Sequence, residues 1–319
     1  MNWRNTLSIL LVLFIFATGI AFGQQTTEDF ESQRIISDQL DGAIDVHAGD
    51  LDGDNDADVV AVGRYGNKVV WYENLGGSFS SEKVIGSGFD NADCVYVVDI
   101  DSDGDQDVLL ASHGDDKIAL FRNTSSGFAD AELITSNADG ANYVYADDID
   151  GDGDVDVLSA SQFDGHLAWY ENTGSGFSSA NVIATMSDGP ETVQTADLNN
   201  DGRQDVLVSS GHTDEILWYE NTSEGFSSGN VISDSADGAR DALPMDVDGD
   251  GRVDVVSVSK NINTIRWYEN TSSGFSGNIV TDSADEAFDV HPADLDLDGD
   301  LDLVSASHDD DKVAWYENT

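Results

Sequence analysis

Short runs of apolar and β-branched residues, separated by polar turns, recur along the chain from residue 30 to its end. In one stretch, four such runs occupy residues 141–148 (ANYVYADD), 156–161 (DVLSAS), 166–172 (HLAWYEN) and 177–183. Their length and residue content are typical of strands, and the Gly, Asp, Ser and Thr between them are typical of turns. This pattern predicts a four-stranded antiparallel meander, and residues 30–319 show no helical periodicity.

The meander recurs six times with a nearly constant spacing. An acidic loop begins at each of six positions, 49 residues apart and finally 48 apart: Asp50, Asp99, Asp148, Asp197, Asp246 and Asp294. Tandem four-stranded units of about 40 to 50 residues are the sequence signature of a β-propeller. Runs such as 206–208 are apolar on both faces, as expected for a blade between two neighbours. The sequence therefore predicts an all-β fold, a six-bladed β-propeller of four-stranded antiparallel blades.

The first and last repeats are incomplete in complementary ways. Residues Phe30–Ile36 correspond to the fourth strand of a repeat, and the chain ends in a third strand at 312–319. We therefore expect the strand at 30–36 to pair with residues 312–318 and to complete the last blade, which would remove an exposed sheet edge. Residues 30–319 would then form a single six-bladed propeller of repeats of about 49 residues.

The first 23 residues have the features of a secretion signal peptide. Arg4 supplies a positive charge, residues 7–16 form an apolar run, and residues 21–23 (AFG) offer a small-x-small cleavage site. The apolar run is too short for a comfortable membrane span, so a cleaved signal is preferred over a single membrane anchor. Residues 24–29 would be a short linker. The mature protein is expected to be secreted, extracellular or at the cell surface, with no segment inserted in the membrane.

The composition is strongly acidic, with 13 Lys and Arg against 63 Asp and Glu and a formal net charge of −50 at pH 7. Such a surface repels the phosphates of nucleic acids and of anionic membranes, so neither is expected as a partner. The hydrophobic content of 39%, arranged in regular runs, argues against disorder. Cys94 is the only cysteine, so an internal disulfide is impossible.

The acidic loops place oxygen ligands at alternate positions. In the third loop, carboxylates stand at positions one, three, five and nine, and a glycine that can take positive φ stands at position six. Calcium takes about six to eight oxygen ligands, and this spacing can wrap them around one ion. The predicted ligands, from loop one to loop six, are Asp50, Asp52, Asp54 and Asp58; Asp99, Asp101, Asp103 and Asp107; Asp148, Asp150, Asp152 and Asp156; Asp197, Asn199, Asp201 and Asp205; Asp246, Asp248, Asp250 and Asp254; and Asp294, Asp296, Asp298 and Asp302.

The six predicted calcium sites are not equivalent. Loop one has Asn55 at the turn position, where glycine adopts the left-handed conformation at lower cost. Loop four has Asn199 in place of the second acid, so it should bind calcium most weakly. In loop five, Arg252 stands at position seven, where only the backbone carbonyl is needed. Because protein oxygens would fill most of the coordination sphere, we expect calcium to be structural.

The pattern D-x-D-x-D-G-x-x-D, followed by a Val/Leu strand, resembles the FG-GAP or VCBS-type repeat of the integrin α-subunit propeller and of many secreted bacterial proteins. The resemblance covers residues 30–319. It implies that each acidic loop joins the first and second strands of a blade and binds calcium there. It also implies partner recognition on the opposite face, which would hold the Asp-Gly turns, such as the one at Asp139, and loops such as 113–116 and 308–311.

Two sets of repeated residues have a structural interpretation. The aromatic pair Trp169-Tyr170 and its counterparts are expected to pack between blades rather than to stack on sugars, because the pair lies within an apolar run. The repeated Asp of the Asp139 type is expected to form a turn rather than to bind a ligand.

Two positions on the innermost strand vary from blade to blade. They indicate either an asymmetric pocket at the central channel or simple sequence drift. Three residues before the loops stand His47, Tyr96, Tyr145, Gln194, Leu243 and His291, and five before them stand Asp45, Cys94, Tyr143, Thr192, Asp241 and Asp289.

The leading hypothesis is a monomeric, secreted, calcium-binding propeller that acts as a protein- or carbohydrate-binding or adhesion module. Its partner would be an extracellular protein or polysaccharide. No Gly-x-Ser-x-Gly, His-Glu-x-x-His or phosphate-loop motif is present. The alternative is a polysaccharide lyase or hydrolase at the channel mouth, with His47, His291, Tyr96 and Tyr145 as catalytic candidates. A third hypothesis is a scaffold or spacer without a ligand site.

Overall fold

The computed structural model describes residues 34–310 and 312–319, which form strands and turns and contain no helix. The predicted signal peptide and linker, residues 1–29, lie outside the described residues. Blades one to three consist of β1 (Ala43–Gly49), β2 (Asp58–Gly63), β3 (Lys68–Tyr72) and β4 (Lys83–Ser87); β5 (Ala92–Val98), β6 (Asp107–Ser112), β7 (Lys117–Phe121) and β8 (Glu132–Thr135); and β9 (Ala141–Asp147), β10 (Asp156–Ser161), β11 (His166–Tyr170) and β12 (Asn181–Thr185).

Blades four to six continue the same pattern. Blade four has β13 (Thr192–Ala196), β14 (Asp205–Ser210), β15 (Glu215–Tyr219) and β18 (Asn230–Ser233), with a small hairpin of β16 (Asn221–Thr222) and β17 (Gly225–Phe226). Blade five has β19 (Ala239–Met245), β20 (Asp254–Ser259), β21 (Thr264–Thr271) and β22 (Gly274–Thr281), and blade six has β23 (Ala287–Ala293), β24 (Asp302–Ser307) and β25 (Lys312–Tyr316). The predicted all-β, six-bladed propeller is confirmed.

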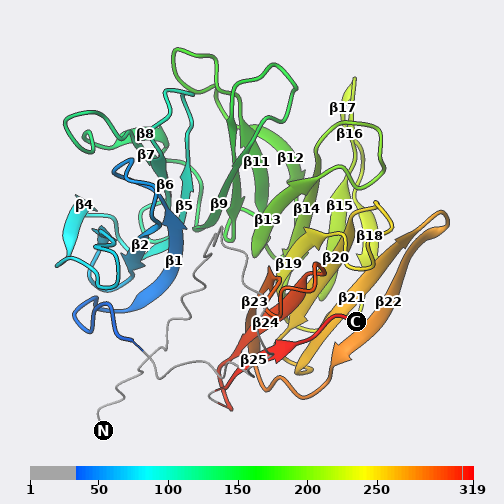
Figure 1. Cartoon of the computed structure of the whole chain (residues 1–319). Coiled ribbons are helices and arrows are strands. Elements are labelled where there is room, and N and C mark those ends of the chain that lie inside the picture. The colour runs from blue at the N-terminus through cyan, green and yellow to red at the C-terminus, as the bar shows by residue number, and fades with distance from the viewer. Residues whose placement is uncertain (1–33, 311) are drawn as a thin grey trace, which may run out of the picture.

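Each blade is an antiparallel meander, and the blades surround a common axis (Figure 1). The first strands of successive blades contact one another, so they line the centre. Because connections alternate between the two ends of a meander, loops one to six and the hairpins after each third strand share one face. We call this the acidic-loop face. The turns after each second strand and the connections between blades form the opposite face.

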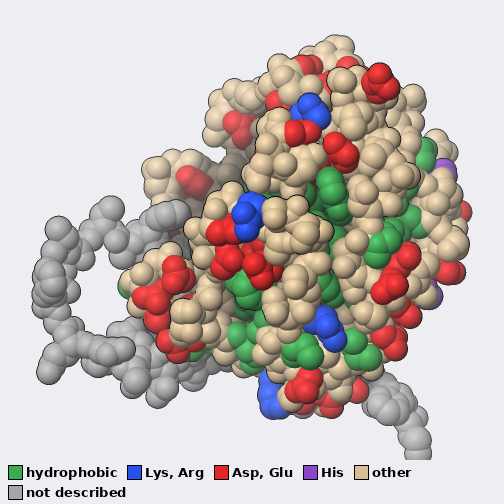
Figure 2. All heavy atoms as spheres, turned by 90° about the vertical axis from the view of Figure 1, so that its right-hand side faces the viewer, with side chains coloured by type: hydrophobic (Ala, Val, Ile, Leu, Met, Phe, Trp, Pro, Cys, Tyr) green, Lys and Arg blue, Asp and Glu red, His purple; other side chains and the backbone are tan. Residues whose placement is uncertain are grey.

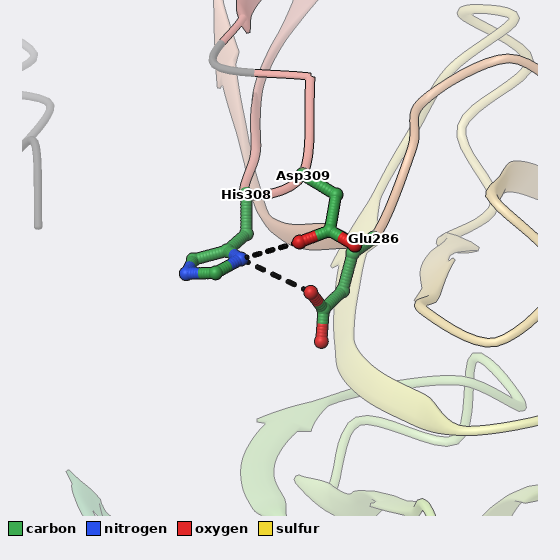
Figure 3. A group of neighbouring side chains, drawn as sticks. All are labelled: Glu286, His308 and Asp309. Atoms are coloured by element: carbon green, nitrogen blue, oxygen red, sulfur yellow. Dashed lines mark hydrogen bonds and ion pairs between the residues drawn. The ribbon is translucent and has the colours of Figure 1, made fainter. Parts of the chain in front are cut away.

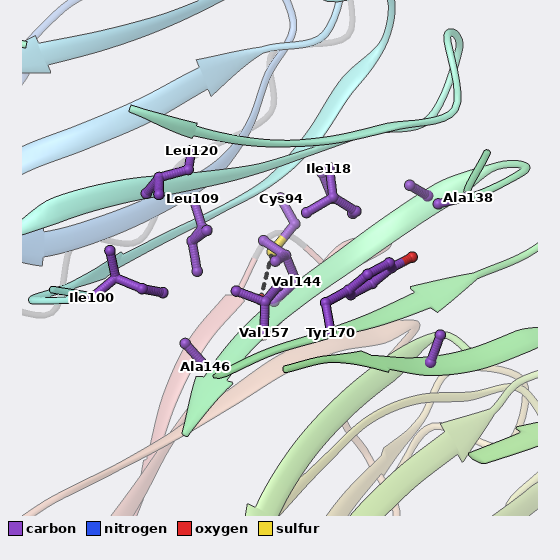
Figure 4. Close-up of a cluster of buried hydrophobic side chains, with 13 residues drawn as sticks. Cys94, Ile100, Leu109, Ile118, Leu120, Ala138, Val144, Ala146, Val157 and Tyr170 are labelled. Carbon is purple, nitrogen blue, oxygen red and sulfur yellow. Dashed lines mark hydrogen bonds between the residues drawn. The ribbon is translucent and has the colours of Figure 1, made fainter. Parts of the chain in front are cut away.

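The second strand of each blade forms the interior of the molecule. All six residues of this strand are buried in blades one to five, as expected for a strand covered on both sides. Figure 4 shows the cluster between blades two and three, where Leu109 and Ile118 meet Val157 and Tyr170. Dense packing of this kind makes a Leu→Ala change cost about 2–5 kcal/mol of unfolding free energy.

The aromatic pairs pack between the blades, as predicted. Tyr72, Tyr170, Tyr219 and Tyr268 are buried, and the last three belong to inter-blade clusters, whereas Tyr72 packs within blade one and against Ile36 and Leu40. The exception is blade six, where Trp315 is 44% exposed on β25. The fold therefore leaves these rings, outside the last blade, unavailable to a ligand.

The fourth strand of a blade begins later than the sequence pattern indicates. In blade three it spans Asn181–Thr185 instead of 177–183. The reason is a turn: Thr173 Oγ1 donates to the carbonyl of Gly176 at 2.8 Å, and the N–H of Ser178 donates to the carbonyl of Glu171 at 2.8 Å. These bonds hold residues 173–178 in the hairpin after β11, so the fourth strand begins only after this segment.

The predicted closing strand, Phe30–Ile36, lies mostly outside the described residues. Its described part, residues 34–36, is not a strand, and the described sheet of blade six has three strands. Ile36 packs instead against Val59, Ala61, Val70 and Tyr72 of blade one. Pairing with β25 is thus not found for residues 34–36 and stays a prediction for residues 30–33. The described residues include no helix long and apolar enough to cross a membrane.

Candidate functional site

The first aspartate of loops one to five organises the loop backbone. In loop one, Asp50 Oδ1 accepts hydrogen bonds from the N–H groups of Gly53 and Asp54 at 2.8 and 3.1 Å, and Oδ2 accepts one from Asn55 at 3.0 Å. The loop therefore curls around this carboxylate. As predicted, position six has positive φ, with Gly153 at 96° and Asn55 at 70°.

Position four of the loop also has positive φ, which the sequence analysis did not identify. Glycine occupies this position in three loops, but Ser102, Asn200 and Leu297 occupy it in the others with φ of 58°, 58° and 64°. A left-handed conformation costs a non-glycine residue about 1–2 kcal/mol. The signal that could have revealed it is the glycine of loops one, three and five, two positions before the turn residue.

The ninth-position aspartate is the buried base of each loop. Asp58, Asp107, Asp156, Asp205, Asp254 and Asp302 are at most 1% exposed. In loop three, Asp156 Oδ2 accepts a hydrogen bond from Ile149 N at 3.1 Å, and Oδ1 accepts one from Asn172 N at 2.7 Å. The residue thus joins the start of its loop to the hairpin of its own blade, a role additional to the predicted one of ligand.

The structure brings the predicted ligands together. Oxygen atoms of three carboxylates lie within 4.8 Å of one another in four loops: Asp50, Asp52 and Asp58; Asp99, Asp101 and Asp107; Asp148, Asp150 and Asp156; and Asp246, Asp248 and Asp250. The donors are all carboxylate oxygens, which suit a hard cation such as calcium. In these four loops, residues at alternate positions thus converge on one point, as the spacing predicts.

Two observations show that these residues fit a cation. Asp246 Oδ1 and Asp294 Oδ1, both from position one, are buried and have no hydrogen-bond partner among the described residues. Burial, reinforced by a neighbouring carboxylate of the same loop, raises the pKa of Asp107, Asp156 and Asp205 to about 6. A bound cation would supply the missing partner of the buried oxygens, and it would stabilise the ionised form of the buried carboxylates.

Arginine side chains already neutralise part of the charge in three loops. Arg203 and Arg252, both at position seven, form ion pairs with the fifth-position acids Asp201 and Asp250. The Nε atom of Arg252 also donates to the carbonyl of Asn270 at 2.5 Å. In loop two, Arg122 reaches over from the third strand, and its Nη1 lies 2.7 Å from Asp101 Oδ2. The spacing of the acids predicts only a backbone role for position seven, so this charge compensation is a finding of the structure.

Three of the four catalytic candidates lie in one row near the axis. The ring centroids of His47 and Tyr96 are 4.8 Å apart, and those of Tyr96 and Tyr145 are 4.9 Å apart. His291 instead lies beside Asp289, with Nε2 3.7 Å from Oδ2. Burial lowers the pKa of His47 to about 4 and raises the pKa of both tyrosines. These shifts move the three groups away from the near-neutral pKa that favours acid–base catalysis.

The variable acids near the axis differ in their surroundings. Burial raises the pKa of Asp45 to about 6, yet both its oxygens accept backbone hydrogen bonds at 2.8 Å, from Val46 N and Val95 N. Asp45 therefore links blades one and two. Burial, with Asp289 nearby, raises the pKa of Asp241 to about 7. Cys94 is buried with Sγ 3.7 Å from the carbonyl of Val144, and burial raises the pKa of its thiol, so it is not activated.

The opposite face presents aromatic rings to solvent. Tyr65 and Phe163, in the turns after β2 and β10, are 71% and 65% exposed. The rings lie over the Asp-Gly turns: a Cβ on Gly42 would lie 2.6 Å from Tyr65, and one on Gly140 would lie 2.8 Å from Phe163. The ring of His113, on the blade between them, meets Phe163 edge to face at 4.8 Å. We call Tyr65, His113 and Phe163 the aromatic set.

Blade six carries a polar group at the corresponding position of this face. Figure 3 shows His308 between two carboxylates, with Nδ1 3.0 Å from Glu286 Oε2 and 2.9 Å from Asp309 Oδ1. The hydrogen bond to Asp309 and the charge of Glu286 raise the pKa of His308. In five of the six repeats the Asp at this turn accepts a backbone bond, as in Asp139, whose carbonyl receives the N–H of Phe163 at 3.0 Å. The predicted turn role of this residue is confirmed there.

The chain matches the pattern of the FG-GAP-like repeat over residues 50–110, 99–159, 148–208, 197–257 and 246–305. No curated protein matches it. Among solved structures, it resembles an auxiliary nutrient binding protein from Bacteroides thetaiotaomicron VPI-5482, with 12% identity, a TM-score of 0.57, and coverage of 87% of this chain and 70% of the other.

Two further solved structures have the same fold at similarly low identity. An auxiliary nutrient binding protein from Bacteroides ovatus ATCC 8483 is 11% identical, with a TM-score of 0.58 and coverage of 87% and 70%. BBS1N, solved in complex with ARL6DN, is 13% identical, with a TM-score of 0.59 and coverage of 86% and 78%. With sequence identities this low, the similarity shows only that the folds are alike.

Proposed function

This chain belongs to the FG-GAP-like repeat family, and from that premise we propose that it is a secreted, calcium-stabilised propeller that binds an extracellular polysaccharide or protein. The acidic-loop face would hold the ions, and the opposite face would hold the ligand. Calcium, when bound, would neutralise and cross-link the converging carboxylates; the residues that would hold it are those of loops one to six. Two of the similar solved structures are described as nutrient binding proteins, which supports a binding role.

The aromatic set is the observation that carries the proposal. The surface of the protein is strongly acidic, and Figure 2 shows acidic side chains on one side of the molecule. Large exposed aromatic rings are unusual on such a surface. Tyr65 and Phe163 are held over preformed turns, so binding a ligand to them would cost little conformational entropy. Flat rings bordered by carboxylates and amides suit the apolar faces and the hydroxyls of sugars, so a polysaccharide is the ligand that these residues favour.

The proposal is tested by screening the purified chain on a glycan array. The glycan that binds best is then titrated into the protein in a buffer that contains calcium. Tyr65→Ala and Phe163→Ala should each weaken binding by up to about tenfold, since a well-placed aromatic contact is worth about 0.5–1.5 kcal/mol. Leu75→Ala is the matched control, because Leu75 is 56% exposed but lies on the acidic-loop face. Equal loss in all three variants, or no loss in the two aromatic ones, would contradict the proposed face.

A further inference from the structure

The second residue of loops one to five is held from two sides. In loop one, the N–H of Leu51 donates to Asp58 Oδ2 of its own blade at 3.1 Å. Its carbonyl accepts a hydrogen bond from Asn123 Nδ2, which belongs to blade two, at 2.7 Å. Because residue two stands between the first and third ligand positions, both bonds fix the backbone that carries these ligands.

The cross-blade bond repeats at every seam from blade one to blade six. After Asn123, the side-chain amides of Asn172, Asn221, Asn270 and Asn318 donate to the position-two carbonyl of the preceding blade. These carbonyls belong to Ile100, Ile149, Leu198 and Val247, and the distances are 3.1, 2.7, 2.8 and 2.7 Å.

These asparagines also connect to the acidic loop of their own blade. The N–H of Asn123 donates to Asp107 Oδ1 at 2.6 Å, and Asp107 Oδ2 accepts from the N–H of Ile100 at 3.2 Å. The carbonyl of Ile100 in turn accepts from Asn172. The same order of bonds recurs in each following blade, so one path of hydrogen bonds, buried in blades two to five and part-buried in blades one and six, passes through the base of all six loops.

The path has one gap within the described residues. By the repeat, Asn74 of blade one would donate to the position-two carbonyl of blade six, which is that of Leu295. Here Asn74 Nδ2 donates instead to Ala57 O of its own loop, at 3.1 Å. Asn74 also keeps the own-blade bond of its N–H to Asp58 Oδ1 at 2.7 Å.

We propose that Asn123, Asn172, Asn221, Asn270 and Asn318 are positioning residues that couple each acidic loop to the blade that follows it. A cation bound in one loop then stiffens the seam to the next blade, and loosening a seam weakens the preceding loop. The coupling has a direction, because the donor always lies on the later blade and the acceptor in the earlier loop. This inference rests on the proposed calcium binding.

The burial of these groups makes the coupling strong. Asn123, Asn221 and Asn270 are 8% exposed and Asn172 is 6% exposed, so their bonds are shielded from water. A buried carbonyl that loses its donor has little water available to replace it. Movement of the loop backbone therefore cannot occur without breaking the inter-blade bond.

Hydrogen–deuterium exchange of the full chain, measured over a calcium titration, tests the coupling. Asn123 is the best site for substitution, because its Nδ2 makes the cross-blade bond and no other described one. In Asn123→Ala, the calcium concentration that half-protects residues 50–58 should rise by about tenfold, as expected for one lost buried hydrogen bond. Residues 99–107, the loop of its own blade, should change by less than about twofold.

Thr124→Ala is the matched control in the same hairpin. Thr124 Oγ1 donates to the carbonyl of Gly127 at 2.7 Å and makes no described bond to another blade. It should leave loop one unchanged. An effect of Asn123→Ala confined to loop two, equal effects on all six loops, or an equal effect of Thr124→Ala on loop one would overturn the proposal.

A variant on the loop side covers the case in which Asn123→Ala does not fold. Asp103→Asn removes the charge of an exposed predicted ligand of loop two. It should reduce calcium-dependent protection around Asn172 in blade three and leave residues around Asn74 in blade one unchanged; the reverse order would overturn the proposal. If no loop of the wild type responds to calcium, the proposed calcium role fails. The coupling is then decided by exchange without calcium, where Asn123→Ala must still loosen loop one more than loop two.

Discussion

In loop three, Asp148, Asp150 and Asp156 are the same residue type in different surroundings. Asp148 accepts N–H groups from Gly151 and Gly153 at 2.8 and 3.1 Å and so shapes the loop. Asp156 is 1% exposed, and burial raises its pKa to about 6. The spacing of the acids predicts that all of them can face one ion. The role of each carboxylate depends on which backbone N–H groups lie within hydrogen-bond distance of it in the folded loop.

Asp241 allows a test of charge burial near the axis. Its pKa is raised to about 7 by burial and by Asp289, so in the folded protein it holds its proton to a higher pH than in the unfolded chain. Its contribution to stability is therefore complete below pH ~4 and is lost as pH rises through about 7. Asp241→Asn should raise Tm by several degrees at pH 8 and change it little at pH 4.5.

Thermal unfolding at fixed calcium, from pH 4.5 to 8, measures this effect. Asp241 Oδ1 accepts the N–H of Ala242 at 2.8 Å, and the amide oxygen of asparagine can keep this bond. Asp130→Asn, at an exposed position, is the control and should shift Tm at neither pH. A Tm that is unchanged at pH 8, or lowered equally at both pH values, would show that burial does not penalise this carboxylate.

At the scale of the element, the acidic loop is largely predictable from its sequence. Ligand positions, the turn at position six and the flanking strands follow from local spacing. The ion pairs of Arg203 and Arg252 join residues two positions apart in one loop, but spacing alone does not show which way the side chain turns. In the folded loop the guanidinium is also held by the hairpin of its own blade, where Arg203 Nε donates to the carbonyl of Asn221 at 2.6 Å. Loops two, four and five thus each have one predicted ligand carboxylate paired with an arginine.

Loop four provides a direct test of ligand charge. Asn199→Asp restores the missing acid and should raise calcium affinity at this loop by about tenfold. Without calcium the same change should lower Tm, because the contact of Asn199 Nδ2 with Asp201 Oδ2, 3.4 Å apart, is replaced by two like charges. Calorimetric calcium titration and Tm in chelator measure the two effects. In loop three, the reverse change Asp150→Asn should lower calcium affinity and raise Tm in chelator. If Asn199→Asp and Asp150→Asn both lowered calcium affinity, the argument from ligand charge would be contradicted.

At the scale of the whole molecule, stability depends on contacts between blades as much as within them. The inter-blade clusters run from blade one to blade six, and the path of asparagine bonds runs beside them. A net charge of −50 opposes this compact ring. Cations bound in the loops would reduce that repulsion and hold the seams.

Calcium removal should therefore destabilise the entire propeller. With free calcium at about 100 times its dissociation constant, each site adds about 2.7 kcal/mol of unfolding free energy. Chelation should then lower Tm by at least about 5 °C, and added calcium should raise Tm with concentration. Differential scanning calorimetry with and without chelator measures the shift. Magnesium, which requires a tighter octahedral site, is the control and should restore less stability. Superimposable curves would contradict the proposed calcium role.

By itself, the sequence determined the repeat number, the strands, the acidic loops and the burial of the aromatic pairs, because these depend on the spacing of residues within one repeat. Only the tertiary structure decided the features that join different repeats. These are the asparagine bonds, 71 or 72 residues apart, and the row formed by His47, Tyr96 and Tyr145. Their partners meet only when the blades pack side by side, so no local pattern in the chain specifies them.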